Sequence, residues 1–282
     1  MPIVYEPAGK AREYAPLAAN LYSGCSHGCK YCFGGCVLRK TVAEFHANVR
    51  PKKDVLERFG KDAVRLRGDD REILLSFVTD PYQPVEMDLK ITREAIKILI
   101  RNELRFTILT KGGTRATRDF DLLEGYDKCS FGTTLVFDSI SDEREWEPMA
   151  PGTNDRIVAI RAAKVLGIRT WVSLEPVIDP KQALKLIRDL HDVVDHWKVG
   201  KINYRPEIER KIDWKDFTHE IVGLLDNLRA SYYIKESLRD ILKQGSVFDQ
   251  ILAYSLELCA FNDPAFVEEL NSFYRQHLNE IL

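Results

Sequence analysis

The stretch SGCSHGCKYCF, residues 23–33, decides how this sequence is interpreted, because it gathers three cysteines on one short segment. Cys25, Cys29 and Cys32 form the pattern C-x3-C-x2-C, and Cys36 follows four residues later. A dense set of thiols on one loop is typical of a site that holds a metal or an iron–sulfur cluster. Thiolates at this spacing can reach three of the four irons of a [4Fe–4S] cubane and leave the fourth iron open for another ligand.

Two other interpretations of these cysteines stay open. Structural zinc takes four ligands, and Cys36 or His27 would supply the fourth. Cys36 would instead close the cubane in an electron-carrying ferredoxin, although bacterial carriers space their cysteines as C-x2-C-x2-C. A disulfide framework is disfavoured, since a chain of 282 residues is large enough to build its own core and shows no export signal.

Length and composition exclude several classes of protein. The 282 residues suffice for one large domain or two small ones, and 45% hydrophobic residues make a disordered chain implausible. The sequence has no apolar run of the roughly 18 residues that a membrane span needs, and its N-terminus has no basic and apolar leader. We therefore expect a cytoplasmic protein with no membrane partner. A net charge of -2 gives no support for nucleic acid as a bulk polyelectrolyte partner.

Strand-like and helical segments alternate after the cysteines. Short β-branched or aromatic runs predict strands at residues 73–79, 105–110, 130–137, 169–174, 196–202 and 231–234. Helical periodicity predicts helices at residues 91–101, 154–166, 180–190 and 214–228. Thr92 and Asp179 are expected to start helices, and Gly167 to end one. Six βαβ-like units in succession favour an α/β partial barrel with parallel strands over an open doubly wound sheet.

The sequence after Lys235 predicts helices only, at residues 236–243, 246–258 and 264–282. We expect two regions, a partial barrel over residues 1–205 and a mainly helical extension over residues 206–282 that packs on it. Cys129 and Cys259 stand alone among apolar neighbours, so we expect both to be small buried side chains.

The cysteine segment, with Tyr31 before its third cysteine, resembles the signature of radical S-adenosylmethionine (SAM) enzymes. Four stretches narrow the resemblance, namely NLYSGCSHGC at 20–29, TDPYQPVE at 79–86, TK at 110–111, and WEP at 146–148 followed by Arg156. They resemble the spore photoproduct lyase-like branch, also labelled DNA-repair-photolyase-like. The resemblance covers roughly residues 1–205 and is weak in the helical tail.

This resemblance implies a partial (β/α)6 TIM-like barrel that carries a [4Fe–4S] cluster on Cys25, Cys29 and Cys32. It also implies that SAM binds the open iron. An electron from a reductant such as flavodoxin or ferredoxin would then cleave SAM to methionine and a 5′-deoxyadenosyl radical, which abstracts a hydrogen atom from the substrate. The candidate polar residues fall at the carboxyl ends of predicted strands, where barrel enzymes assemble their sites.

Eight residues, one on the cysteine loop and the others on or after predicted strands, are expected to bind SAM: Tyr31, Thr79, Asp80, Lys111, Thr134, Ser173, Glu175 and Asn203. The resemblance places Thr79 and Asp80 near the ribose or the ammonium group, and Lys111 near the carboxylate. The alternative for Asp80 is a turn before the proline that follows it. Ser173 and Glu175 share one face of a strand, where a glutamate is costly unless it is paired.

Glu147 and Arg156 flank a loop that matches the lyase-like motif. Two roles stay open for them, because they would either position SAM or pair with each other.

Spore photoproduct repair itself is not expected. The lyase reaction returns a hydrogen atom from a cysteine near the Thr-Asp stretch, and the nearest equivalents here are Phe77 and Ser76. The aromatic residue after the third cysteine is Phe33, which has no hydroxyl group to relay a hydrogen atom.

We therefore predict a radical SAM enzyme whose substrate is unidentified, and the family resemblance alone keeps a nucleic acid or nucleotide among the candidates. The one local basic cluster is Arg39, Lys40, Arg50, Lys52 and Lys53, which is typical of a solvated linker face. The alternative from another class is a non-catalytic iron–sulfur electron carrier or a metal-stabilised binding module.

Overall fold

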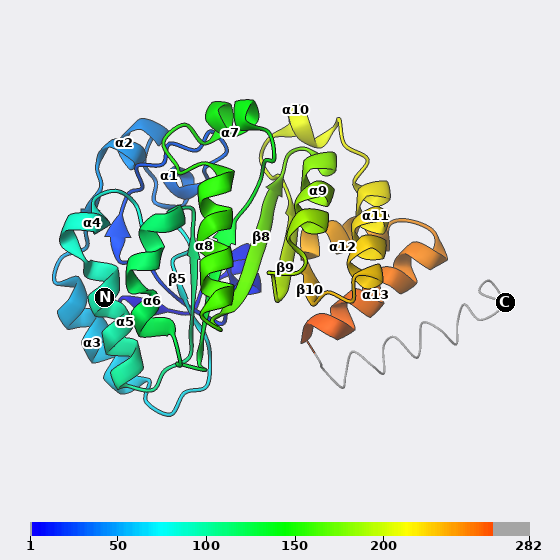
Figure 1. Ribbon diagram of the computed structural model, residues 1–282. Helices are drawn as coiled ribbons and strands as arrows, with labels where there is room; N and C mark the ends of the chain where they lie inside the picture. Colours follow the sequence, from blue (N-terminus) through cyan, green and yellow to red (C-terminus); the bar gives the residue numbers. More distant parts are fainter. Residues whose placement is uncertain (1, 262–282) are drawn as a thin grey trace. The chain divides into compact units, whose positions relative to one another are not determined.

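A computed structural model describes residues 2–261 of the chain, with side chains up to residue 257 (Figure 1). The described residues form two compact units, one made of residues up to 172 with 192–195, the other of 173–191 with 196–261. The predicted region boundary at residue 205 stays a prediction, and the helix expected at 264–282 lies outside the described residues. Among the described helices, none is long and apolar enough to cross a membrane.

The first unit is built on a mostly parallel sheet. Its strand order is β1-β2-β5-β6-β7, and β1 and β2 are the antiparallel pair. These strands are β1 (Val4–Tyr5), β2 (Leu17–Ala19), β5 (Ile73–Leu75), β6 (Phe106–Thr110) and β7 (Cys129–Thr134). A separate antiparallel pair joins β3 (Tyr22–Ser23) to β4 (Arg50–Pro51) on either side of the first two helices.

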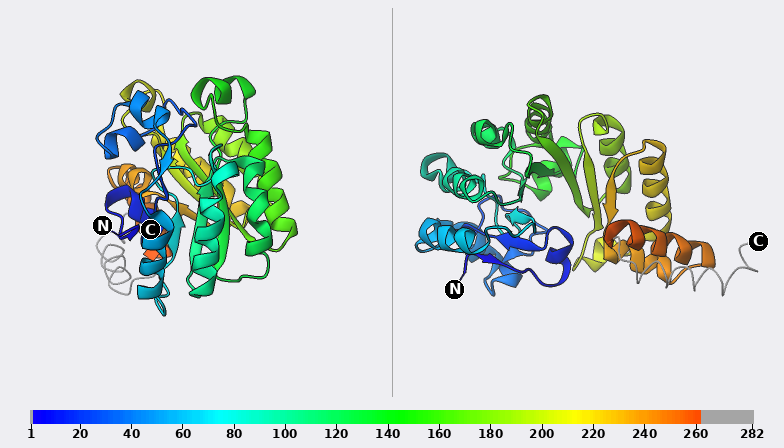
Figure 2. Two further views of the ribbon diagram at one scale, coloured as in Figure 1. Left: turned by 90° about the vertical axis from the view of Figure 1, so that its left-hand side faces the viewer. Right: turned by 90° about the horizontal axis from the view of Figure 1, so that it is seen from below.

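Helices cover one face of this sheet (Figures 1 and 2). Helix α3 packs against α5, and α8 packs against the short 3₁₀ helix η2. The helical segments of the unit are η1 (Gly9–Glu13), α1 (Gly34–Val37), α2 (Val42–Ala47), α3 (Val55–Arg65), α4 (Glu86–Leu89), α5 (Ile91–Arg101), η2 (Gly113–Asp119), α6 (Phe120–Leu123), α7 (Ile140–Trp146) and α8 (Thr153–Val165).

The two faces of the sheet differ in chemistry, because successive side chains of a strand alternate between them. Phe106 points into the apolar core under the helices. On the other face, the Thr107 hydroxyl lies 2.6 Å from that of Ser130 and accepts the indole N–H of Trp171 at 2.8 Å. A Cβ at Gly132 would lie 2.1 Å from the Trp171 ring, so only glycine fits there. The face away from the helices is therefore closely packed, and it carries these polar groups beside a small apolar cluster that includes Ala18, Leu74 and Trp171.

In the second unit, β9 (His196–Lys201) and β10 (Tyr232–Ile234) are parallel. Strand β8 (Arg169–Val177) carries the chain from the first unit into the second. The helices of the second unit are α9 (Pro180–Leu190), α10 (Pro206–Glu209), α11 (Trp214–Asn227), α12 (Glu236–Lys243) and α13 (Val247–Phe261). Helix α12 packs against α11 and α13. The predicted α/β class and the helical C-terminal region are confirmed for the described residues.

Two of the three predicted helix boundaries are confirmed. Asp179 caps α9, since its carboxylate accepts backbone N–H groups of the first turn, and Gly167 follows α8 with a φ of 71°. The prediction for Thr92 is wrong, because α5 starts before it, after Lys90. The Thr92 hydroxyl is instead used to donate to the carbonyl of Pro81 at 2.7 Å.

The strand predicted over 73–79 ends early, at residue 75. The side-chain oxygen of Asn20 accepts the backbone N–H groups of Phe77 at 3.2 Å and Val78 at 2.8 Å. These are the groups that a longer strand would use in its ladder, so the chain turns away from the sheet here.

Candidate active site

The cysteine loop, residues 23–33, lies between β3 and α1. Cys25 and Cys29 are buried, with 9% and 7% of their surface exposed, and Cys32 is half-buried. Cys36 differs, because it lies in α1 and is exposed. The three cysteines predicted as cluster ligands are thus the three that the fold turns inward.

Helix α2 holds the first part of the loop. The N–H of Cys25 donates to the carbonyl of Phe45 at 3.2 Å, and Nδ1 of His46 lies 2.6 Å from the carbonyl of Cys25. Gly24 has a φ of 93°, and a Cβ there would lie 2.6 Å from the carbonyl oxygens of Phe45 and Asn48. The approach of α2 therefore requires glycine at this position.

Gln83 holds the loop from the other side. Its side chain is fully buried; the amide oxygen accepts the N–H of Ser26 at 3.1 Å, and the amide nitrogen donates to the carbonyl of Gly24 at 3.3 Å. Further along, the N–H of Lys30 donates to the carbonyl of Trp146 at 2.8 Å. The loop is thus fixed by amide and backbone groups and not by its own thiols.

Two hydroxyl groups near the end of β5 have no hydrogen-bond partner among the described residues. They belong to Ser76 and Thr79, which are 2% and 6% exposed. A buried hydroxyl group without a partner carries a free-energy cost, so its presence is typical of a place that a ligand completes. Thr79 is one of the residues predicted to bind SAM.

Asp80 uses both carboxylate oxygens within the protein. One oxygen accepts the N–H of Tyr82 at 2.8 Å and the hydroxyl of Thr110 at 2.6 Å, and the other accepts the N–H of Lys111 at 2.6 Å. Asp80 therefore forms the turn that was its alternative role. Because it holds the carboxyl end of β6, it also fixes the place from which the Lys111 side chain starts.

Glu147 is the centre of a buried network. It accepts the hydroxyl of Tyr31, and its other oxygen pairs with Arg156 at 2.6 Å, while Nζ of Lys111 lies 3.9 Å away. Arg156 also donates to the carbonyl of Thr134 at 3.0 Å. Burial raises the pKa of Glu147, and Arg156 opposes that shift. Glu147 and Arg156 thus pair with each other, and they link the cysteine loop to β7.

Burial raises the pKa of all three loop thiols, that of Cys29 to about 12. Three backbone groups oppose this, since the N–H group of His27 donates to the sulfur of Cys25 and those of Gly34 and Gly35 donate to the sulfur of Cys32. Sulfurs that accept N–H groups in a buried loop suit iron–sulfur ligation, because iron replaces the proton on sulfur and the N–H groups tune the cluster. The donor set therefore fits a [4Fe–4S] cluster.

A single metal ion would need a tighter arrangement. Within residues 2–257, no three His, Cys, Asp or Glu side chains converge closely enough to hold one ion. A cubane is wider than one ion and its ligands stand further apart.

His27 is a neutral residue of this site. It is 1% exposed, its Nε2 lies 3.1 Å from a guanidinium nitrogen of Arg115, and its Nδ1 lies 3.5 Å from Asp80. Burial lowers the pKa of His27 to about 4, although Asp80 opposes the shift. His27 therefore connects the cysteine loop to Asp80 and Arg115.

The second unit holds the other three residues that were predicted to bind SAM. Glu175 forms an ion pair with the buried Lys235 at 2.5 Å, and a Cβ at Gly200 would lie within 2.9 Å of both side chains. Ser173 is buried, and Asn203 donates to a backbone carbonyl at the end of β9 at 3.0 Å. Glu175 is thus paired, as its burial requires, and the SAM contacts of these residues stay predictions.

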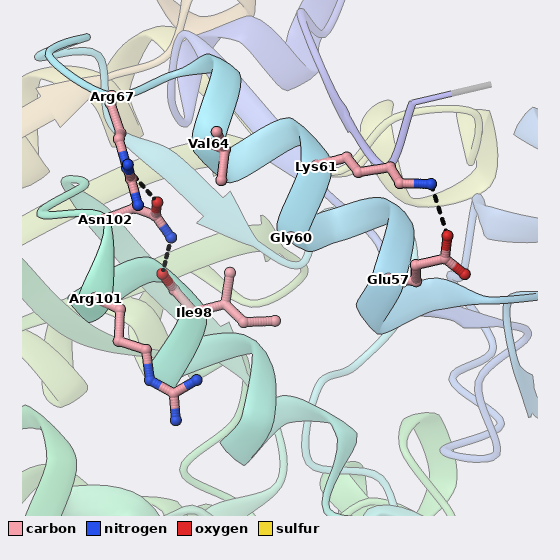
Figure 3. Close-up of a pocket in the computed structure, with 8 residues that line it drawn as sticks. All are labelled: Glu57, Gly60, Lys61, Val64, Arg67, Ile98, Arg101 and Asn102. Atoms are coloured by element: carbon pink, nitrogen blue, oxygen red, sulfur yellow. Dashed lines mark hydrogen bonds and ion pairs between the residues drawn. The ribbon is translucent and has the colours of Figure 1, made fainter.

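A shallow groove of the first unit carries no comparable chemistry (Figure 3). It lies between α3 and α5 and runs along most of α3, from Glu57 to Arg67 just past the helix end, beside the carboxyl end of α5. Its polar groups are bonded to one another, as Arg67 is to Asn102 at 2.7 Å and Lys61 to Glu57 at 2.6 Å. The groove is lined by Glu57, Gly60, Lys61, Val64, Arg67, Ile98, Arg101 and Asn102.

Comparison with known proteins identifies the family. The profile of the Radical SAM superfamily matches residues 19–194, which include the cysteine loop and the first-unit residues described above for the candidate site. The chain belongs to the radical SAM superfamily. Members of this superfamily are enzymes that use SAM and an iron–sulfur cluster, and that require a reductant and a substrate.

Curated relatives of this chain include two proteins that are named only as uncharacterised. A protein of Methanocaldococcus jannaschii is 27% identical over 165 residues, which are 58% of this chain and 61% of the relative. A protein of Mycobacterium tuberculosis is 28% identical over 170 residues, 56% of this chain and 48% of the relative. The chain thus spans between about half and three fifths of the length of these relatives.

Solved structures confirm the expected fold. Spore photoproduct lyase with bound AdoMet and dinucleoside spore photoproduct has a TM-score of 0.62 at 13% identity, over 81% of this chain and 78% of the lyase. SuiB of Streptococcus suis bound to S-adenosylmethionine has a TM-score of 0.60 at 12% identity, over 83% of this chain and 54% of SuiB. The predicted TIM-like radical SAM fold is therefore correct.

Proposed function

We propose that this chain is a radical SAM enzyme that binds a [4Fe–4S] cluster through Cys25, Cys29 and Cys32 and abstracts a hydrogen atom from its substrate. When bound and reduced, such a cluster supplies the electron that cleaves SAM to methionine and a 5′-deoxyadenosyl radical. The observation that carries the proposal is that one loop holds the buried thiols of Cys25 and Cys29 and the half-buried thiol of Cys32, with backbone N–H groups donating to the sulfurs of Cys25 and Cys32. The exposure of Cys36 in α1 favours three ligands over the four of an electron carrier.

Lys111 is the residue that we assign to the SAM carboxylate. Its backbone is held by Asp80, and its ammonium group lies 5.4 Å from the centre of the Tyr31 ring and 3.9 Å from Glu147. Burial and these contacts keep the cation in one place, so an arriving carboxylate meets an oriented charge. Tyr31 and Glu147 thus act by positioning Lys111, and Asp80 does so through the backbone.

Thr79 and Thr134 complete the first-unit part of the proposed SAM site. The unpartnered hydroxyl of Thr79 would bond the ribose or the ammonium group of SAM. Thr134 ends β7 and is held through its carbonyl by Arg156. Ser173, Glu175 and Asn203 are the residues of the second unit that we keep in the proposed site.

The substrate is not a spore photoproduct in this proposal. Phe77, which stands near the place of the hydrogen-donating cysteine, packs between two aromatic rings, those of Phe33 at 5.2 Å and Tyr14 at 5.6 Å. This arrangement offers neither a thiol nor a relay from Phe33. The similar structures include a lyase with a dinucleoside and SuiB with a precursor peptide. We therefore keep a nucleic acid or nucleotide as one substrate class beside a peptide or small metabolite.

We place the enzyme in the cytoplasm, where thiols stay reduced and where flavodoxin or ferredoxin would supply the electron. The direct test is anaerobic reconstitution with iron and sulfide, followed by dithionite and SAM. We expect release of 5′-deoxyadenosine and methionine, and none from Cys25→Ala. A reconstituted protein that holds its cluster but releases no 5′-deoxyadenosine would be an electron carrier, contrary to the proposal.

A second experiment tests the Lys111 assignment. Lys111→Met removes the charge but retains an unbranched side chain, so we expect the Kd for SAM to rise about tenfold or more while iron content stays normal. Lys97→Met is the matched control, since Lys97 lies on α5 in a pair with Glu94. Equal SAM affinity in Lys111→Met and in the unaltered protein would contradict the assignment. Deuterium transfer from a labelled substrate into 5′-deoxyadenosine would then identify the substrate class.

A further inference from the structure

Exposed apolar side chains gather next to the cysteine loop. Phe33, Val37, Leu38 and Val42 are 37%, 56%, 40% and 57% exposed. Phe33 ends the cysteine loop, Val37 and Leu38 end and follow α1, and Val42 begins α2; these two short helices pack against each other (Figure 1). Single exposed apolar residues are ordinary, but four within ten residues form a patch that marks an interaction site. We call these four residues the α1–α2 patch.

The chain segment that carries this patch is basic. Residues 30–53 contain six basic residues and one acidic residue, whereas the rest of the chain has 35 basic and 42 acidic residues. Arg39, Arg50 and Lys53 are exposed. Lys40 donates to the hydroxyl of Ser23 at 3.4 Å, and Ser23 stands opposite Arg50 in the β3–β4 pair, so the two basic segments meet on one face.

The α1–α2 patch is the outer side of the cysteine loop. Phe45 of α2 accepts the N–H of Cys25, and a Cβ at Gly34 of α1 would lie 2.5 Å from the Phe45 ring. Both helices therefore rest directly on the loop. Cys32 is the least buried of the three loop cysteines, and the patch residue Phe33 follows it in the chain. A protein bound at the patch would thus have a short path to the cluster ligands.

The chemistry of the patch fits an acidic protein better than a phosphate backbone. A central apolar area with a charged rim is the usual anatomy of a protein interface. A single-stranded nucleic acid would call for several aromatic rings between basic residues, and the patch has one, Phe33. In a chain whose remaining residues are net acidic, this local charge would also orient an acidic partner toward the patch.

We propose that the α1–α2 patch, with Arg39, Arg50 and Lys53 as its rim, is the docking surface for a small acidic one-electron carrier protein of the flavodoxin class. The proposal rests on the proposed function, because it presupposes a cluster in the loop that needs an electron. One electron leaves the reduced carrier and enters the cluster. The carrier is oxidised by one electron, the cluster is reduced by one, and no bond forms or breaks in this step.

The test uses the reconstituted holoprotein and flavodoxin as the probe, with binding measured by calorimetry at several salt concentrations. We expect Arg39→Glu/Lys53→Glu to raise the Kd about tenfold at low salt and to flatten its salt dependence. Val37→Glu should also weaken binding. The matched controls are Lys181→Glu and Val165→Glu, which alter exposed residues of α9 and α8 and should bind as the unaltered protein does.

A second readout is the rate of cluster reduction, followed by absorbance. Reduced flavodoxin should reduce the double variant about tenfold more slowly, whereas dithionite, which needs no docking surface, should reduce both proteins equally. Equal flavodoxin affinity in the double variant and the unaltered protein would overturn the proposal. Single-stranded DNA is the second probe. A double variant that binds single-stranded DNA more weakly than the unaltered protein but binds flavodoxin equally well would also overturn the proposal. If flavodoxin binding falls as expected but dithionite and SAM yield no 5′-deoxyadenosine, the docking surface stands and the proposed function is wrong.

Discussion

The cysteine loop and Cys129 of β7 both bury sulfur, but they use it in opposite ways. The thiol of Cys129 donates to the carbonyl of Tyr126 at 3.1 Å and that of Leu123 at 3.6 Å. In the loop, the sulfurs of Cys25 and Cys32 accept backbone N–H groups instead.

This difference separates a structural cysteine from a ligand. A sulfur that donates is stable as a thiol, because deprotonation would set its negative charge against carbonyl oxygens. A sulfur that accepts N–H groups is best satisfied once its proton is gone, and iron removes that proton. Burial alone does not distinguish them, since it raises the pKa of both Cys29 and Cys129 to about 12.

The sharpest test of the comparison is the loss of iron. Cys25→Ala, Cys29→Ala and Cys32→Ala should each reduce iron and sulfide after reconstitution from about four of each per chain to a small fraction of that. Cys36→Ala and Cys129→Ala should retain them, because one residue is exposed and the other uses its thiol as a donor. Loss of the cluster in Cys36→Ala would show that the loop has four ligands.

Glu147→Gln should have the next largest effect, because it leaves the fully buried Arg156 without its charge partner. Breaking a buried pair in this way costs about 3–5 kcal/mol, and the Tyr31 contact of the loop weakens with it. Thermal unfolding and iron content measure the two consequences. The control is Glu57→Gln at the exposed pair with Lys61, for which we expect almost no change in Tm.

Gly24→Ala tests whether the backbone holds the loop. The new Cβ would lie 2.6 Å from two carbonyl oxygens at a φ of 93°, so we expect a loss of about 2 kcal/mol or more and a lower cluster yield. Gly125→Ala is the control near Cys129, since its φ is 76° but nothing lies within 4 Å of the new Cβ. It should cost about 1 kcal/mol and leave iron content unchanged. Equal cluster yields in the two variants would argue against a rigid loop.

The raised pKa of Cys129 predicts that the stability of the protein depends on pH. Its pKa is raised from 9.0 to about 12 by burial, with Asp127 and Glu72 adding to the shift. The stability that this contributes is complete below pH 9 and is lost as the pH rises from 9 toward 12. Chemical denaturation between pH 8 and 11 should show a steeper loss in the unaltered protein than in Cys129→Ala. The comparison with Cys129→Ala is needed because burial also raises the pKa of Tyr126 to about 12, so Tyr126 contributes its own loss of stability at high pH.

Local pattern was enough for the parts of the fold and site that depend on local chemistry. Cys25, Cys29 and Cys32 were singled out from spacing alone, and their role as cluster ligands stays a prediction. Helices α9 and α12 have the predicted bounds because caps and periodicity lie within each helix. Helix α2 was missed, although Thr41 and Glu44 form a capping box that the sequence displays.

Contacts between distant segments could not be predicted in this way. The side chains of Asn20 and Gln83 bond backbone groups 57 to 59 residues away, and no pattern indicates which amide will find which N–H group. The motif singled out Asp80, but whether it serves a ligand or a turn depended on Thr110 and Lys111 of another strand. His46 was not singled out either, because its contact with the loop exists only once α2 forms.

The amide and backbone groups that fix the cysteine loop have a consequence for the life of the protein. Gln83 and the carbonyl of Phe45 hold the loop without help from sulfur or iron. The chain should therefore fold before a cluster is inserted. The cysteine loop should then already have the conformation that accepts a cluster from a donor protein. By the same reasoning, oxygen damage that strips the iron should be repairable by reinsertion, with no need for the protein to be made anew.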